Sequence, residues 1–192
     1  LVDDAPRAGR QQFVRQVRPV RRHEVADPVH STANFAVKHM VVATFRGAFD
    51  EVSGSLDLGG EQPALVGEVA VPSIQVKDEN LYGHLQSPDF FDAATTPTIT
   101  FASTSVARDG DQVAIEGDLT IKGTTHRVSA TGTWLEIEAD IAGNPRIGID
   151  VETTIDRTAY GLDWNAPLPK GGFALDNDVT LGVHLEFVPA EG

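Results

Sequence analysis

The sequence predicts an all-β fold: an antiparallel barrel of about eight strands with one or two short helices. Apolar and polar residues alternate from about Pro28 onward, which is the pattern of half-buried strands. Short turn sequences such as Arg108–Asp111 separate these runs and indicate hairpins. Glycines within the runs permit the tight bends of a barrel and favour it over a two-sheet sandwich, although the sequence alone does not separate the two folds.

The clearest strand covers residues 178–189, where five apolar side chains share one face: Val179, Leu181, Val183, Leu185 and Phe187. Residues 113–121 alternate in the same way, and residues 127–134 place Val128, Ala130, Gly132 and Trp134 on one side. The remaining strand candidates are residues 32–40, 48–58, 64–71, 97–104 and 145–155.

Two stretches depart from this alternation. Residues 77–86 predict about two turns of helix, and residues 88–92 predict a second short helix. Ser87 is a suitable N-cap for the second helix, and Pro88 suits its first position. Residues 157–162 form another irregular segment.

Composition indicates one folded domain preceded by a charged segment. The chain has 192 residues, 41% of them hydrophobic, and a net charge of −13. Residues 1–22 contain six arginines and two aspartates, a net charge of +4, so the remainder carries −17. We therefore expect a basic, flexible N-terminal arm over residues 1–22 and a barrel domain over residues 23–192.

The same numbers exclude several functional classes. A strongly acidic domain disfavours nucleic-acid binding and charge-driven docking on anionic membranes. The absence of cysteine excludes disulfides and cysteine-ligated metals. No apolar run is long enough for a transmembrane helix. No secretory signal is visible, and a signal removed before Leu1 is compatible with the sequence, so the compartment is not assigned.

Catalytic and metal-binding motifs are missing from the sequence. None of the six histidines forms a closely spaced pair typical of zinc sites, and only His39 and His184, both on predicted strands, were candidates to converge. Arg157 lies near Asp156 and Tyr160 and could present a cation to a ligand head group. The alternative is that Arg157 pairs with Asp156 and fixes a loop.

Aromatic residues provide a stronger indication of function. Phe90 and Phe91 are adjacent in a turn-rich segment, where polar residues are the norm. Such a pair either fills a core or lines an apolar cavity, and an eight-stranded barrel is the smallest that holds a small ligand. Small residues such as Ala102 and Ala130 on the inward faces would leave room for one.

Four motifs, in order, resemble the YceI-like family of bacterial lipocalin-like barrels that bind polyprenyl lipids. They are DPVHSTANFAVKHM, HLQSPDFFD followed by PTITFAST, GDLTIKGTTHRV, and IDRTAYGLDWN, and the resemblance covers residues 25–188. One departure is that Leu81 and Tyr82 occupy the place where the family often has Arg-Asp, which predicts a more apolar cavity rim.

The resemblance implies a protein that sequesters or transports a long-chain isoprenoid, polyprenyl or quinone-like, without catalysis, cofactor or metal. Such binding is compatible with storage, transfer and a stress-associated role alike, and a homodimer is one expected oligomeric state. The residues expected at the cavity or its mouth are Phe35, Val37, Phe45, Phe49, Phe90, Phe91, Ile99, Phe101, Trp134, Tyr160 and Trp164. The polar head-group candidates are His30, His84 and Arg157.

Two other functions remain open at this point. An enzyme could act on an isoprenoid or other amphiphile in the same cavity, with His84 and Asp89 as acid and base. Alternatively, the basic arm could recruit an acidic partner. A carrier needs no catalytic group, because apolar burial contributes about 0.8 kcal/mol per methylene.

Overall fold

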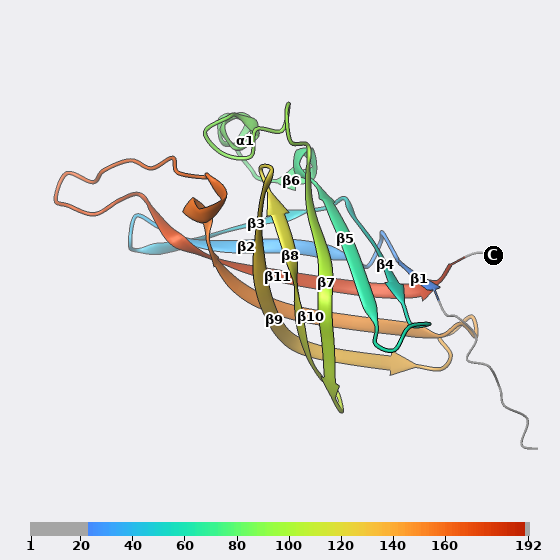
Figure 1. Ribbon diagram of the computed structural model, residues 1–192. Helices are drawn as coiled ribbons and strands as arrows, with labels where there is room; N and C mark the ends of the chain where they lie inside the picture. Colours follow the sequence, from blue (N-terminus) through green and yellow to red (C-terminus); the bar gives the residue numbers. More distant parts are fainter. Residues whose placement is uncertain (1–22, 191–192) are drawn as a thin grey trace, which may run out of the picture.

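The computed structural model describes residues 23–190, which form a closed antiparallel β-barrel with eight strand positions and one α-helix (Figure 1). This confirms the predicted fold class. The strands are β1 (His23–Ala26), β2 (Thr32–His39), β3 (Ala43–Phe49), β4 (Val52–Asp57), β5 (Ala64–Ala70), β6 (Ile74–Gln75), β7 (Thr98–Asp109), β8 (Gln112–Ile121), β9 (Thr124–Ile137), β10 (Arg146–Asp156) and β11 (Leu175–Pro189). The basic segment 1–22 lies outside the described residues.

Three of the strand positions are split along their length. The long strand β11 pairs with β1 near Phe187 and with β2 from Leu175 to His184, so β1 and β2 share one position. In the same way β4 and β3 share the next position, and β5 and β6 share the third. The ring closes because β1 pairs with β11 on one side and with β4 on the other.

The single strand predicted over residues 48–58 is therefore wrong, since it is interrupted between Phe49 and Val52. The interruption is stabilised by the neighbouring position: the Asp50 N–H donates to the Ser73 carbonyl at 3.3 Å, and the Ala70 N–H donates to the Glu51 carbonyl at 3.0 Å. Each half of the split position then pairs with a different partner.

The first predicted helix is confirmed as α1 (Glu79–Gln86), capped by Asp78, whose carboxylate accepts from the Leu81 N–H at 2.8 Å. The second predicted helix is wrong, because residues 88–92 form turns instead. Ser87 ends α1, and its carbonyl accepts from the Phe90 N–H at 3.0 Å. The irregular segment at 157–162 begins with η2 (Arg157–Tyr160), and η1 (Val71–Ser73) precedes β6.

The two ends of the barrel are different. One end, called the open end below, carries α1, the turn between β2 and β3, and the long loop 161–174 (Figure 1). The opposite end, called the closed end, carries β1, the loop between β9 and β10, and the end of β11 (Figure 1).

Large apolar side chains fill the closed end. The buried residues at this level, called the plug below, are Leu56, Val106, Val113, Trp134, Ile147, Ile149 and Phe187. The Trp134 indole N–H donates to Glu136 Oε1 at 2.6 Å, and the Arg108 guanidinium lies 4.5 Å from the Trp134 ring centre. These polar contacts satisfy the indole, so the plug buries tryptophan without an unpaired donor.

An ion-pair network centred on Arg146 also lies at the closed end. Arg146 Nε donates to Asp140 Oδ2 at 2.7 Å, and Nη1 donates to Asp27 Oδ2 at 3.1 Å and to Glu186. His30 Nδ1 lies 2.9 Å from Asp27 Oδ2. The network joins the segment between β1 and β2 to the β9–β10 loop and to β11.

The network predicts an acid-dependent loss of stability. Hydrogen bonds from His30, the Val29 N–H and Arg146 lower the pKa of Asp27 from 3.8 to about 2. A carboxyl group whose pKa is lowered by folding contributes its full stabilisation at pH values above its pKa in the unfolded chain. This stabilisation is lost as the pH falls through its pKa in the folded protein. We therefore expect Asp27→Asn to destabilise the protein at pH 7 and the difference to vanish between about pH 4 and pH 2.

Urea unfolding at a series of pH values measures this difference. The matched control is Asp118→Asn, since Asp118 makes only an exposed pair with Arg127. A difference between parent and Asp27→Asn that persists unchanged at pH 2 would contradict the prediction. His30 acts with the opposite sign, because the Asp27 carboxylate raises its pKa and its contribution is lost as pH rises.

Candidate functional site

An apolar cavity of about 480 Å³ occupies the barrel between the plug and the open end. Its size lies in the range of about 300 to 1,000 Å³ that is typical of small-ligand sites. Its wall is formed by residues of β2, β3, β4, β5, β7, β8, β9, β10 and β11. On β11 these are Leu175, Val179, Leu181, Val183 and Leu185, whereas Phe187, the next inward residue, belongs to the plug.

A chain of aromatic rings runs along one side of the cavity. The Phe35 ring centre lies 6.0 Å from that of Phe45 and 5.9 Å from that of Phe49. Phe49 in turn meets Phe91 edge to face at 5.9 Å. The chain connects the hairpin β2–β3 to the segment that follows α1, so Phe91 both packs in the core and lines the cavity.

A second aromatic group lies where the cavity reaches the open end. The His84 ring centre is 4.9 Å from Phe90 and 4.7 Å from Trp164, both in edge-to-face contact. Phe90 and Trp164 are 5.5 Å apart. The group joins α1 and its following turn to the loop 161–174, and His84 Nε2 lies 3.2 Å from Asp89 Oδ2 at the surface.

Arg157 is a buried cation beside the cavity, 5% exposed. Its Nε donates to the Asp176 carbonyl at 2.8 Å, and its Nη1 donates to the carbonyls of Leu162 and Trp164. These bonds hold the loop 161–174 against the start of β11, and burial lowers the pKa of Arg157. The Nη2 group is buried and has no hydrogen-bond partner. The alternative predicted from the sequence, that Arg157 fixes a loop by pairing with Asp156, names the wrong partner. Arg157 does fix the loop, but it does so through backbone carbonyls.

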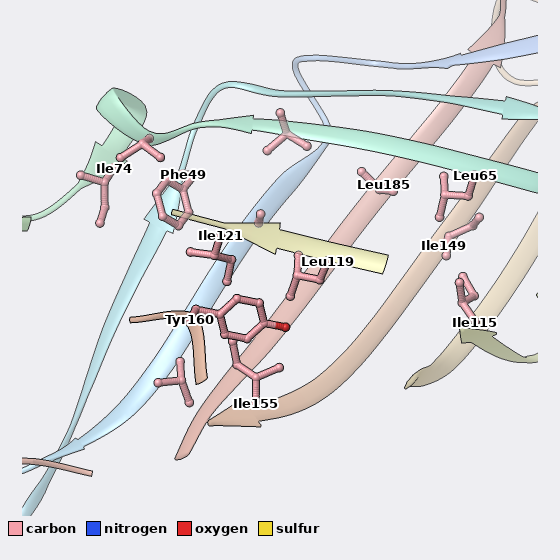
Figure 2. Close-up of a cluster of buried hydrophobic side chains, with 14 of the residues drawn as sticks. Phe49, Leu65, Ile74, Ile115, Leu119, Ile121, Ile149, Ile155, Tyr160 and Leu185 are labelled. Carbon is pink, nitrogen blue, oxygen red and sulfur yellow. The ribbon is translucent and has the colours of Figure 1, made fainter. Parts of the chain in front are cut away.

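Tyr160 places a second polar group in the same wall. The ring lies among Leu119, Ile121 and Ile155, with its hydroxyl oxygen turned toward Leu119 (Figure 2). The hydroxyl is buried without a hydrogen-bond partner, and burial raises the pKa of Tyr160. An unpaired buried hydroxyl costs free energy, so this position offers a ready donor to a ligand atom.

The structure brings most of the predicted site residues together. Ten of the eleven predicted apolar and aromatic residues line the cavity, as do His84 and Arg157; the ten are Phe35, Val37, Phe45, Phe49, Phe90, Phe91, Ile99, Phe101, Tyr160 and Trp164. Trp134 does not line it, because its side chain belongs to the plug. His30 does not line it either, because its ring pairs with Asp27 at the closed end. Of the two residues that predicted a more apolar cavity border, Leu81 lies in the cavity wall, whereas Tyr82 does not line the cavity and donates its hydroxyl to the Pro72 carbonyl at 3.0 Å.

The histidine pair considered from the sequence does not converge. His184 lies opposite Thr32, whereas His39 lies opposite Leu175 at the other end of β2. Within residues 23–190, one set of three groups has the spacing of metal ligands: Asp27, His30 and Glu186. Arg146 already donates to both of these carboxylates, so the set functions as an ion-pair network.

Sequence reasoning left several lining residues out of the predicted site. The alternation of apolar and polar residues predicts that Leu181 and Val183 point into the barrel. They were nevertheless not assigned to the cavity, which both of them line. Leu162 and Ala174 lie in the loop 161–174, which hydrogen bonds from Arg157 and between Asn165 and Leu175 fold back toward the cavity. No sequence pattern predicts that contact.

Comparisons with known proteins agree with this architecture. The family model described as the YceI-like domain matches residues 25–187. A UPF0312 protein of Staphylococcus aureus strain USA300 is 32% identical over 169 residues, covering 86% of this chain and 96% of the relative. The corresponding protein of strain MSSA476 is 31% identical over the same length and coverage.

Solved structures show the same fold. The crystal structure of BcnA from Burkholderia cenocepacia has a TM-score of 0.71 at 24% identity and covers 84% of this chain and 98% of its own. A polyisoprenoid binding domain from Saccharophagus degradans, implicated in plant cell wall breakdown, has a TM-score of 0.67 at 14% identity, covering 89% and 100%. Among residues 23–190, no helix has the length and hydrophobicity required to cross a bilayer.

Proposed function

The chain belongs to the YceI-like family, and we propose that it binds and sequesters or carries a long-chain isoprenoid lipid, polyprenyl or quinone-like, in the barrel cavity. The observation that carries this proposal is the cavity itself: about 480 Å³, walled by aliphatic and aromatic side chains and closed at one end. Such a space suits a linear apolar chain and offers water few hydrogen-bonding partners. The polyisoprenoid binding domain with the same fold supports the ligand class.

The wall also supports a binding role without catalysis. The polar groups beside the cavity are few, and Arg157 uses most of its donors to hold the loop 161–174. His84 and Asp89 contact each other at the surface beside the open end. In the proposed arrangement the isoprenoid tail fills the cavity, and the head group lies near Arg157, Tyr160 and His84.

Mass spectrometry of an organic extract tests the proposal directly. The natively purified protein should release one isoprenoid per chain, and an aliquot that is denatured and washed free of released small molecules before extraction should carry none. An empty extract, followed by no uptake of added polyprenyl lipid, would refute the proposal. Added lipid recovered in chemically altered form would instead favour an enzyme that uses His84 and Asp89.

Tyr160→Phe should separate the effect of the hydroxyl on the stability of the empty protein from its effect on ligand affinity. We expect the empty variant to be more stable by about 1 kcal/mol, because an unpaired buried hydroxyl is removed. Its affinity for a prenyl alcohol or quinone should fall severalfold, whereas its affinity for a pure isoprenoid hydrocarbon should not change. Fluorescence titration with both ligands and thermal unfolding measure these effects. An equal loss of affinity for both ligands would show that the hydroxyl does not contact a head group.

A further inference from the structure

Exposed apolar side chains gather at the open end of the barrel. Val41 and Val42, in the turn between β2 and β3, are 74% and 88% exposed, and Phe173 in the loop 161–174 is 60% exposed. The two segments are adjacent, because the Met40 N–H donates to the Ala174 carbonyl at 2.7 Å. Such a cluster is costly in water and marks a surface that meets an apolar partner.

This cluster continues into the cavity. Met40 and Trp164 are partly exposed at the surface, and both also line the cavity. The apolar rim is defined here as Met40, Val41, Val42, Trp164 and Phe173. The rim and the cavity wall therefore form one apolar surface that leads from the outside of the barrel to its interior.

The charge around the rim differs from that of the rest of the barrel. The hairpin formed by β2 and β3, residues 32–49, contains Lys38 and Arg46 and no acidic residue. The loop 161–174 contains one acid, Asp163, and one base, Lys170. Residues 23–192 as a whole carry −17, whereas these two segments together carry +2, so the segments that bear the rim lack the acidic excess of the rest of the barrel.

The turn also has apolar residues where the backbone disfavours them. Met40 and Val41 have φ values of 51° and 66°, in the left-handed region that suits asparagine and glycine. A β-branched valine is especially unsuited to this region. The side chain of Val41 contributes little to the core because it is exposed, so folding alone gives no reason for valine here.

We propose that the apolar rim inserts into the interfacial layer of a lipid bilayer and that the isoprenoid passes between bilayer and cavity at this contact. The proposal rests on the proposed function and extends it to the surface where the ligand is exchanged. Insertion is driven by apolar burial, so it requires no anionic lipid and depends only weakly on salt.

A triple variant makes the three most exposed rim residues polar and leaves the cavity wall unchanged: Val41→Asn, Val42→Thr and Phe173→Ser. None of these three residues lines the cavity, and asparagine relieves the backbone conformation at position 41. The matched control is Val29→Thr, Ile137→Thr and Ile141→Asn at the closed end, where Val29 is 79% exposed, Ile137 is 52% exposed and Ile141 is fully exposed.

Flotation with phosphatidylcholine vesicles measures docking, and uptake of a fluorescent polyprenyl lipid from those vesicles measures transfer. The rim variant should lose docking and transfer at least tenfold, whereas the control variant should retain both. Uptake of the same lipid added from ethanol should be unchanged in either variant, and light scattering should report the same oligomeric state.

Each contrary result has its own meaning. A parent protein that takes up no lipid from ethanol refutes the proposed function, whatever its docking. A parent that loads from ethanol but does not float, or a control that loses docking equally, overturns only the insertion. A dimer that dissociates in the rim variant would overturn it as well, since the rim would then be covered by a second copy.

Discussion

Replacing Ala130 with tryptophan should abolish lipid binding while leaving the barrel folded. Ala130 lies on β9, lines the cavity and is opposite Ile115 on β8, so an indole at this position extends into the space proposed for the ligand. If the indole displaces one five-carbon isoprene unit, the ligand loses about 4 kcal/mol of burial, on the order of a thousandfold in Kd. The empty variant should be at least as stable as the parent, because an apolar group fills apolar space.

The outward neighbour provides the control for this prediction. Thr131→Trp adds the same indole to the exposed face of β9 and should leave the affinity unchanged. Ala130→Leu, a smaller addition, should give an intermediate loss. Titration with a polyprenyl lipid and thermal unfolding measure both quantities. Full affinity in the folded Ala130→Trp variant would place the ligand outside the cavity.

Gly132→Ala should be among the most destabilising single substitutions in the barrel. A Cβ atom at this position would lie 1.9 Å from the Asp150 carbonyl oxygen and 2.9 Å from the Val151 Cα, both backbone atoms of β10. The two strands must therefore separate where Gly132 pairs with Val151. We expect a loss of about 3 kcal/mol or more in the free energy of unfolding, or no folded protein at all.

Gly148→Ala tests whether the loss of stability comes from the clash of the new Cβ atom with β10 and not from the replacement of a strand glycine as such. Gly148 is the third residue of the adjacent strand β10, and an added Cβ meets nothing within 4 Å. Its substitution should change stability by less than about 0.5 kcal/mol. Urea unfolding of the two variants side by side decides the matter: similar stabilities would show that β9 and β10 adjust freely at Gly132.

The sequence predicted the strands well because each has one buried face. The alternation from Val179 to Phe187 and from Val113 to Ile121 corresponds to β11 and β8 with the expected residues inside. The split at Asp50 was missed although the sequence carries a sign of it: the buried positions are Gly47 and Phe49 in β3 but Val52 and Leu56 in β4, so the alternation shifts by one residue between the two strands. The different partners of the two strands are not encoded in local alternation.

The sequence predicts which side chains point into the barrel, but it does not predict how far each one lies from the open end. Trp134 and Leu181 both belong to inward faces, and nothing in their local sequence says that one fills the closed end while the other borders the cavity. That difference depends on the register of neighbouring strands, which places Trp134 opposite Ile149. The polar position of Arg157 was recognised, but its carbonyl partners depend on the path of the loop 161–174.

The plug has a consequence for the choice among ligands of different length. A cavity with a floor gives a linear chain a fixed depth, measured from Phe187 and Trp134 to the open end. In the proposed function, each added isoprene unit gains contact until the chain reaches the floor, and every unit beyond that remains outside. Selectivity for chain length would then depend on the plug beneath the cavity wall, and smaller side chains in the plug are expected to admit a longer chain.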